Sequence, residues 1–190
     1  DVAKVVRVFP KKPLGFSSCA RVLRIHQWLK NLLLFVPLFA AHDLGNSDVW
    51  EALIFALLAF CLCSSSVYIA NDLFDLESDR LHPSKRNRPF ASGVVPVWLG
   101  VLVIPFMLVV SLGIASIVGR EFLSWLILYF ALTCAYSWGL KRLIVVDCLA
   151  LALLYTLRII GGAAVVGHEL SFWLLAFSIF LFLSLAFVKR

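Results

Sequence analysis

The sequence predicts an all-α protein, a bundle of helices that crosses a membrane several times. Composition is the first observation: of the 190 residues, 62% are hydrophobic and 15% are charged, and the mean hydropathy is +0.97. A soluble domain is about half apolar and about a quarter charged, so this chain has too little polar surface for a soluble monomer. This composition also excludes disordered chains, coiled coils and disulfide scaffolds. The second observation is that the apolar residues gather in six segments, most of them near the ~17–25 residues that a spanning helix needs.

The six apolar segments must be helices, because hydrocarbon offers no water to satisfy backbone groups. They cover residues 26–42, 49–70, 94–119, 122–139, 143–166 and 170–188. The first is the weakest, since its uninterrupted apolar run is only 32–41, and we expect the half with Trp28 and Lys30 to lie at the membrane interface. Residues 1–20 lack the apolar core of a signal peptide. We interpret them as a linker or N-terminal arm, and 21–190 as the membrane domain.

The later segments differ in what interrupts or ends them. The third contains Pro105 and Gly113, which together predict a kink. The fourth is followed by Gly139, a residue type that commonly ends helices. The fifth carries Arg158 inside an otherwise apolar run, and the sixth ends directly before Lys189.

The basic residues predict which side of the bundle faces the cytoplasm. Fifteen of the 17 Lys and Arg lie in the N-terminal arm through Lys30, in 80–88, at 141–142 and at 189–190. Six spans place all of these segments on one side, with Arg120 alone on the other. Because cytoplasmic loops are enriched in Lys and Arg, we expect this side and the N terminus in the cytoplasm. The net charge of +6 therefore indicates topology, and we expect no nucleic-acid partner.

An acidic motif stands at the cytoplasmic end of the second segment. Asp72, Asp75 and Asp79 are spaced i, i+3 and i+7, and Asn71 precedes them. If the helix continues this far, the three carboxylates share one face, with neighbours about 5–6 Å apart, and they repel unless cations lie between them. Mg²⁺ suits such oxygen ligands and the oxygens of a phosphate-bearing substrate. We predict a magnesium site here; the alternative is a solvated helix end paired with the basic loop 80–88.

Two groups of basic residues extend this prediction. Lys85, Arg86 and Arg88 can bind phosphate oxygens that a metal leaves free, or anionic lipid headgroups, or both. Arg158 lies eleven residues after Asp147, three helical turns deeper. A charged side chain inside a membrane faces a cavity or a partner. The residues leave open whether that partner is a neighbouring carboxylate or a substrate phosphate.

The stretch from Asn71 to Asp79 resembles the NDxxDxxxD motif of the UbiA prenyltransferase superfamily, at the position where that family carries it. Other stretches resemble the branch that contains decaprenyl-phosphate phosphoribosyltransferases: residues 26–31, 82–89, 136–141 and 186–190. The resemblance covers about residues 21–190. It implies a ring of nine transmembrane helices around a lipid-open cavity, of which this chain has six, so that the domain is truncated after the sixth helix. It also implies a bacterial inner membrane, and some such proteins carry a phosphatase domain of the HAD type before their linker.

The resemblance further implies a site and a reaction. Asp72, Asp75 and Asp79 would be the catalytic residues and hold Mg²⁺ against a substrate diphosphate. The residues implied to bind substrate are Lys30, Asn31, Tyr68, Asn71, Lys85, Arg88, Tyr136, Lys141, Asp147 and Arg158. In the phosphoribosyl version, a polyprenyl phosphate attacks phosphoribosyl diphosphate. In the prenyl version, a polyprenyl diphosphate ionises and an aromatic or other small acceptor attacks.

Two functions of other classes stay open on the sequence. A transporter or channel would also carry acids and an intramembrane Arg, but its charges would be spread through the depth of the bilayer. A lipid-binding or assembly subunit would keep the basic loops without needing three aspartates on one face.

Overall fold

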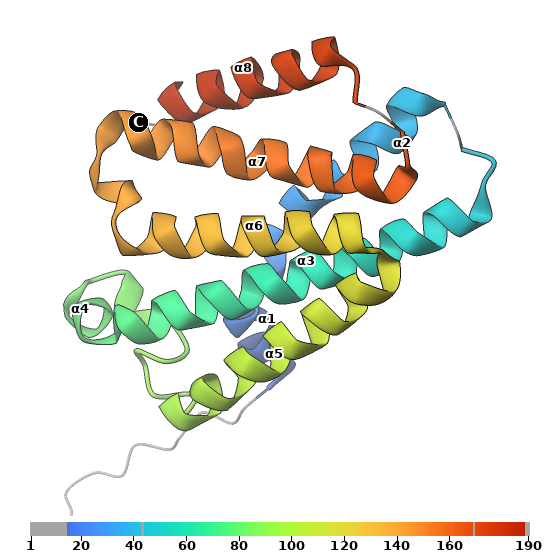
Figure 1. Ribbon diagram of the computed structural model, residues 1–190. Helices are drawn as coiled ribbons and strands as arrows, with labels where there is room; N and C mark the ends of the chain where they lie inside the picture. The colour runs from blue at the N-terminus through green and yellow to red at the C-terminus, as the bar shows by residue number, and fades with distance from the viewer. Residues whose placement is uncertain (1–14, 43, 169, 189–190) are drawn as a thin grey trace, which may run out of the picture.

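The computed structural model describes residues 15–42, 44–168 and 170–188, and these ranges contain helices and turns but no strand (Figure 1). The elements in chain order are α1 (Phe16–Val22), the 3-10 helix η1 (Ile25–Phe35), α2 (Val36–Ala41), α3 (Ser47–Phe74), α4 (Leu76–Leu81), η2 (Lys85–Asn87), α5 (Val97–Val118), α6 (Arg120–Trp138), η3 (Leu140–Arg142), α7 (Ile144–Val166) and α8 (Phe172–Val188).

Each of the six predicted segments is helical, which confirms the predicted all-α class. Three helices are long and apolar enough to cross a membrane, namely α3, α5 and the part Val145–Val166 of α7, and α8 is a shorter apolar helix. The first segment is a 3-10 helix followed by the short α2, in keeping with its short apolar run. Helix α1 begins within the stretch that we expected to be a linker, whereas residues 1–14 of that stretch lie outside the described residues.

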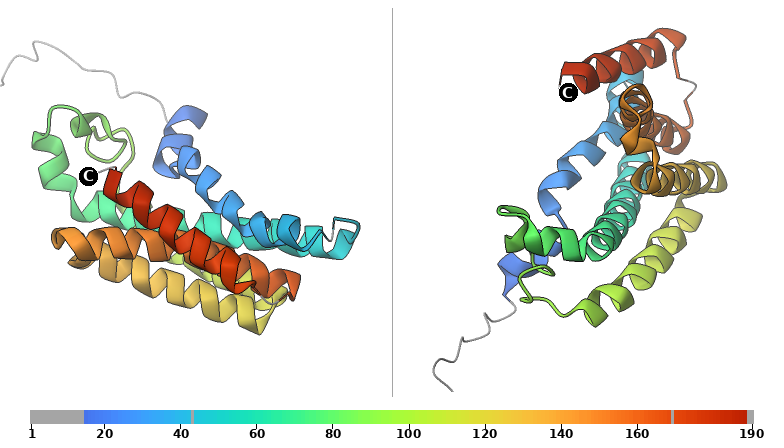
Figure 2. Two further views of the ribbon diagram at one scale, coloured as in Figure 1. Left: turned by 90° about the horizontal axis from the view of Figure 1, so that it is seen from above. Right: turned by 90° about the vertical axis from the view of Figure 1, so that its left-hand side faces the viewer.

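Helix α3 runs through the middle of the bundle, with α5 packed along it and with α6, α7 and η1 against its other sides (Figures 1 and 2). Helix α8 covers α7. The α4 corner, the α6–α7 connection and the end of α8 lie at one end of the bundle, and the α2–α3, α5–α6 and α7–α8 connections lie at the other. The basic segments at 80–88 and 141–142 therefore meet at one end, which we call the α4 end.

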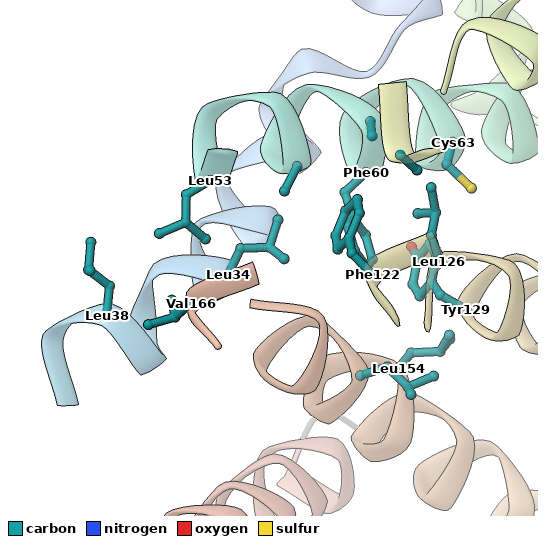
Figure 3. Packing of buried hydrophobic residues seen from close by; sticks show 14 residues of the cluster. Leu34, Leu38, Leu53, Phe60, Cys63, Phe122, Leu126, Tyr129, Leu154 and Val166 are labelled. Atoms are coloured by element: carbon teal, nitrogen blue, oxygen red, sulfur yellow. The ribbon is translucent and has the colours of Figure 1, made fainter. Parts of the chain in front are cut away.

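The apolar core joins α3, α6, α7 and the first segment (Figure 3). The Phe60 ring lies at its centre, 4.9 Å from the Tyr129 ring and 5.8 Å from the Phe122 ring. The backbones of α7 and η1 touch, since a Cβ added to Gly162 would stand 2.1 Å from the carbonyl oxygen of Leu34. A small residue at this crossing is the usual way for membrane helices to approach closely.

Candidate functional site

A cavity of about 660 Å³ lies between α3, α5 and α6, towards the α4 end of the bundle. Its lining divides into an apolar wall and a polar end. The wall consists of Val67, Ala70, Phe74, Ile104, Leu108, Phe130, Cys134 and Trp138, and the polar lining consists of Ser66, Asn71, Asp75, Ser137 and Lys141. This volume and this mixture are typical of small-molecule sites, in which apolar walls bind and a few polar groups orient.

The polar end of the cavity is built from three elements. Asn71 on α3 donates a hydrogen bond from Nδ2 to Ser137 Oγ on α6, at 3.0 Å. Asp75 follows one turn later and is half-buried, and among the described residues its carboxylate has no ion-pair partner. Lys141, in η3, is exposed and lines the same space. A carboxylate, an amide and an ammonium group thus converge beside an apolar wall, which suits a metal-bound phosphate on a hydrocarbon chain.

The helix does not continue through the acidic motif, so the condition on which we expected the three aspartates to share one face is not met. Helix α3 ends at Phe74, Asp75 has a backbone (φ −89°, ψ 7°) outside the helical region, and α4 leaves in another direction (Figure 2, left). Asp75 lines the cavity, whereas Asp72 and Asp79 are buried away from it. The corner sets Asp75 at the cavity, whereas Asp72 and Asp79 stay close to each other, because both bind the Nη1 atom of Arg88.

Arginine side chains supply the cations that we expected between Asp72 and Asp79. Arg24 Nη2 lies 2.5 Å from Asp72 Oδ1. Arg88 Nη1 lies 3.0 Å from the same oxygen and 2.6 Å from Asp79 Oδ2. The other oxygen, Asp79 Oδ1, is buried and has no hydrogen-bond partner among the described residues. We call these four residues the arginine–aspartate cluster.

Comparison with known proteins identifies the family. A profile of the UbiA prenyltransferase family matches residues 31–189. The chain belongs to the UbiA prenyltransferase family. This confirms the resemblance seen in the sequence, and a UbiA homolog from Archaeoglobus fulgidus, solved with GPP and Mg²⁺, shares the fold (TM-score 0.75, 24% identity, 88% of this chain and 60% of that one).

Two curated relatives extend the comparison. The uncharacterized protein y4nM of Sinorhizobium fredii is 44% identical over 181 residues, which make up 95% of this chain and 35% of that protein. The decaprenyl-phosphate phosphoribosyltransferase of Mycolicibacterium smegmatis is 35% identical over 178 residues, which make up 92% of this chain and 56% of the enzyme. The chain thus spans about a third to somewhat more than half the length of these two curated relatives.

Among the described residues, Arg158 of this UbiA-family chain binds neutral partners and not a carboxylate of a neighbouring helix. Its Nε donates to Asn31 Oδ1 (2.8 Å), Nη1 to the Leu154 carbonyl (2.6 Å) and Nη2 to the Tyr129 hydroxyl (2.9 Å). The guanidinium also lies over the Tyr129 and Tyr155 rings, at 4.9 and 5.5 Å. No carboxylate of a described residue lies within ion-pair distance of it. Arg158 is 5% exposed and does not line the cavity.

The remaining predicted residues do not line the cavity. The Tyr136 hydroxyl donates to Asp147 Oδ1 at 2.7 Å. The Tyr68 ring lies 5.0 Å from the Arg24 guanidinium, and Lys30 Nζ lies 5.9 Å from the Tyr155 ring. Lys85 lies on η2 with its side chain exposed. Of the predicted set, only Asn71, Asp75 and Lys141 line the cavity.

Apart from Asn71, Asp75 and Lys141, the sequence analysis missed the residues that line the cavity of this UbiA-family chain, and it also missed Arg24. Ser137 lies within the family-like stretch 136–141, and that stretch was the signal that could have identified it. Phe74 and Trp138 line the cavity while 88% and 89% exposed, which places them at its mouth. Arg24 lies 48 residues from Asp72, and no local pattern predicts that contact.

Proposed function

We propose that the protein is a Mg²⁺-dependent membrane transferase that acts on a polyprenyl phosphate or diphosphate, with the cavity between α3, α5 and α6 as its substrate site. One observation carries this proposal: the cavity joins an apolar wall to a polar end that holds Asn71, Asp75 and Lys141. Such a site matches a substrate whose hydrocarbon chain ends in phosphate. The family membership of the chain supports the same activity.

The donor set at the polar end fits Mg²⁺. This ion takes one or two protein carboxylates and fills its remaining positions with water and substrate phosphate oxygens. Asp75 and the amide oxygen of Asn71 would hold it. Asp72 Oδ1 and Asp79 Oδ2 could bind the ion only beside the arginine nitrogens that they already accept from. When bound, Mg²⁺ neutralises the charge that develops on a departing diphosphate.

The residues of the chain then orient the substrate and exclude water. The Asn71–Ser137 hydrogen bond holds the Asn71 amide in one orientation, and no donor of a described residue binds its oxygen. Lys141 supplies a positive charge for phosphate oxygens of the substrate. The wall formed by Leu108, Phe130 and the other apolar residues binds the polyprenyl chain by removing its surface from water. A dry wall next to charged groups also strengthens their electrostatic effect on the breaking bond.

The specific reaction that we favour is phosphoribosyl transfer from phosphoribosyl diphosphate to a polyprenyl phosphate. A phosphate oxygen of the lipid attacks the anomeric carbon, the bond from that carbon to the diphosphate oxygen breaks, and diphosphate leaves with the electron pair. Relatives named decaprenyl-phosphate phosphoribosyltransferase, 34–35% identical over 84–95% of this chain, support this choice. Prenyl transfer to an aromatic or other small acceptor is the second candidate, because the homolog from Archaeoglobus fulgidus was solved with GPP or DMAPP and Mg²⁺. We propose that the protein lies in a bacterial inner membrane and that its α4 end faces the cytoplasm.

The test is a transfer assay on the full-length gene product in detergent, with labelled phosphoribosyl diphosphate and a polyprenyl phosphate, with and without Mg²⁺. We expect a metal-dependent, lipid-extractable product. A product formed only from a polyprenyl diphosphate and an aromatic acceptor would favour the second candidate. If neither pair of substrates reacts, the transferase proposal fails and a transporter or lipid-binding subunit becomes the better hypothesis.

A further inference from the structure

One arginine bridges the two arms of the corner between α3 and α4. Arg88 Nη1 binds Asp72 Oδ1 in the last turn of α3 and Asp79 Oδ2 in α4, at 3.0 and 2.6 Å. Asp75 lies between these two aspartates in the sequence, at the point where the helix breaks. Arg88 therefore links α3 and α4 on either side of Asp75, which is the one aspartate of the motif that lines the cavity.

Arg24 fastens the N-terminal segment to the same corner. It stands at the turn between α1 and η1, where its backbone is left-handed (φ 49°, ψ 48°). This conformation is uncommon for a residue other than glycine and persists only where the surroundings hold it. The Arg24 side chain provides such contacts, because Nη2 binds Asp72 Oδ1 at 2.5 Å and the guanidinium lies 5.0 Å from the Tyr68 ring.

The arginine–aspartate cluster is balanced in charge. The side chains of Asp72 and Asp79 are 4% and 2% exposed, and those of Arg24 and Arg88 are 23% and 30% exposed. Buried carboxylates are stable only when they are paired, and here two guanidinium groups pair with two carboxylates. Asp72 Oδ1 already accepts from both arginines. A metal ion on this oxygen would have to displace at least one of them.

We propose that Arg24 and Arg88 are positioning residues, which act through Asp72 and Asp79 to hold the α3–α4 corner so that Asp75 faces the cavity. Within the acidic motif, Asp75 then binds the metal, while Asp72 and Asp79 form ion pairs with the arginines. The role of Asp75 as a metal ligand rests on the function proposed above. The ion pairs of the arginine–aspartate cluster do not depend on that function. Neighbouring charges provide matched controls, since Glu77 and Arg86 are exposed and form no ion pair with a described residue.

The first test exchanges the charges of one pair. Arg88→Asp and Asp79→Arg each leave buried carboxylates or guanidinium groups unpaired, so each should lower the melting temperature by about 5–10 °C. In the double variant the Asp79→Arg side chain again lies between two carboxylates, and at least half of the loss should be recovered. Transfer activity should recover in the same proportion. The control pair, Glu77→Arg with Arg86→Asp, should change the melting temperature by less than about 2 °C.

The second test measures metal binding without turnover, with Mn²⁺ as the probe and electron paramagnetic resonance as the readout. Asp79→Asn keeps the size of the side chain and an oxygen that can accept from Arg88, so it should bind Mn²⁺ within about twofold of the wild type, whereas Asp75→Asn should weaken binding at least tenfold. Equal loss in both variants would overturn the division of roles. So would a double exchange that recovers the melting temperature but not the transfer activity, because that result identifies Asp79 as a metal ligand.

The two proposals fail in different ways. A double exchange that leaves the melting temperature as low as in the single variants would overturn the positioning role of Arg88, whatever the activity. If the wild type transfers neither group, the function proposed above fails. The melting temperatures and the Mn²⁺ titration then still decide the positioning role.

Discussion

The polar end of the cavity and the group of side chains around Arg158 both place polar atoms inside apolar helices, yet they differ in how those atoms are bonded. Arg158 uses three of its nitrogens on Asn31, Tyr129 and a backbone carbonyl, and all of these side chains are at most 5% exposed. At the cavity, the Asp75 carboxylate and the Lys141 ammonium reach open space. A buried group whose nitrogens are each hydrogen-bonded to the protein fixes architecture, whereas groups that converge on a cavity can bind a ligand.

This difference can be tested first at Asp75. We expect Asp75→Asn to lower transfer activity about 100- to 1,000-fold, because the metal and the diphosphate lose a charged ligand at the place where negative charge develops. The melting temperature should move by less than about 2 °C, since among the described residues Asp75 has no ion-pair partner to lose. Activity assays and thermal unfolding of the same purified variant measure both. Glu77→Gln, a change of an exposed carboxylate in the next turn, is the control and should be silent.

Arg158 should give the opposite pattern. Arg158→Met leaves the Asn31 oxygen without a donor and removes a bond from the Tyr129 hydroxyl, so we expect a loss of roughly 2–4 kcal/mol in unfolding free energy. The KM for phosphoribosyl diphosphate should stay within about twofold. A double-mutant cycle with Asn31→Leu should show strong coupling, because both changes break the same bond. A large rise in KM with unchanged stability would instead make Arg158 a phosphate ligand.

The helices were predictable from the sequence, and the pairing of the charges was not. Length and apolar composition decide which segments span a membrane, so all six segments were found. The motif around Asp75 could be identified by its spacing, but the corner at Asp75 depends on Arg88, which is bound to both arms. The Arg24–Asp72 contact joins residues 48 positions apart. Charge patterns also cannot predict that Arg158 would bind an amide and a phenol instead of a carboxylate.

The close contact between the backbones of α7 and η1 allows a second test of whether the region around Arg158 stabilises the fold. Gly162 follows Arg158 by one turn, and its Cα approaches the chain at Leu34, one turn after Asn31. A methyl group there would stand 2.1 Å from the Leu34 carbonyl oxygen. Gly162→Ala should therefore force the two backbones apart and cost about 1–3 kcal/mol.

Gly113, in the interior of α5, is the matched control for Gly162. A Cβ at this position meets no atom within 4 Å. Gly113→Ala should be neutral or stabilise the protein by up to about 1 kcal/mol, because alanine favours the helix. Thermal unfolding in detergent compares the two variants. Equal effects would show that the close approach of α7 and η1 does not limit stability.

The smallest expected effect concerns Lys141 and Lys85, both of which were predicted from the sequence to bind substrate. Lys141 lines the cavity, whereas Lys85 is exposed on η2 and does not line it. Lys141→Gln should raise the KM for the diphosphate substrate about tenfold, equivalent to about 1.4 kcal/mol, by removing one charged contact to phosphate. Lys85→Gln should change it less than twofold, because a solvated charge outside the cavity is screened by salt. If both variants raise the KM equally, the basic loop must reach the bound phosphate, and the cavity seen between α3, α5 and α6 is then only part of the substrate site.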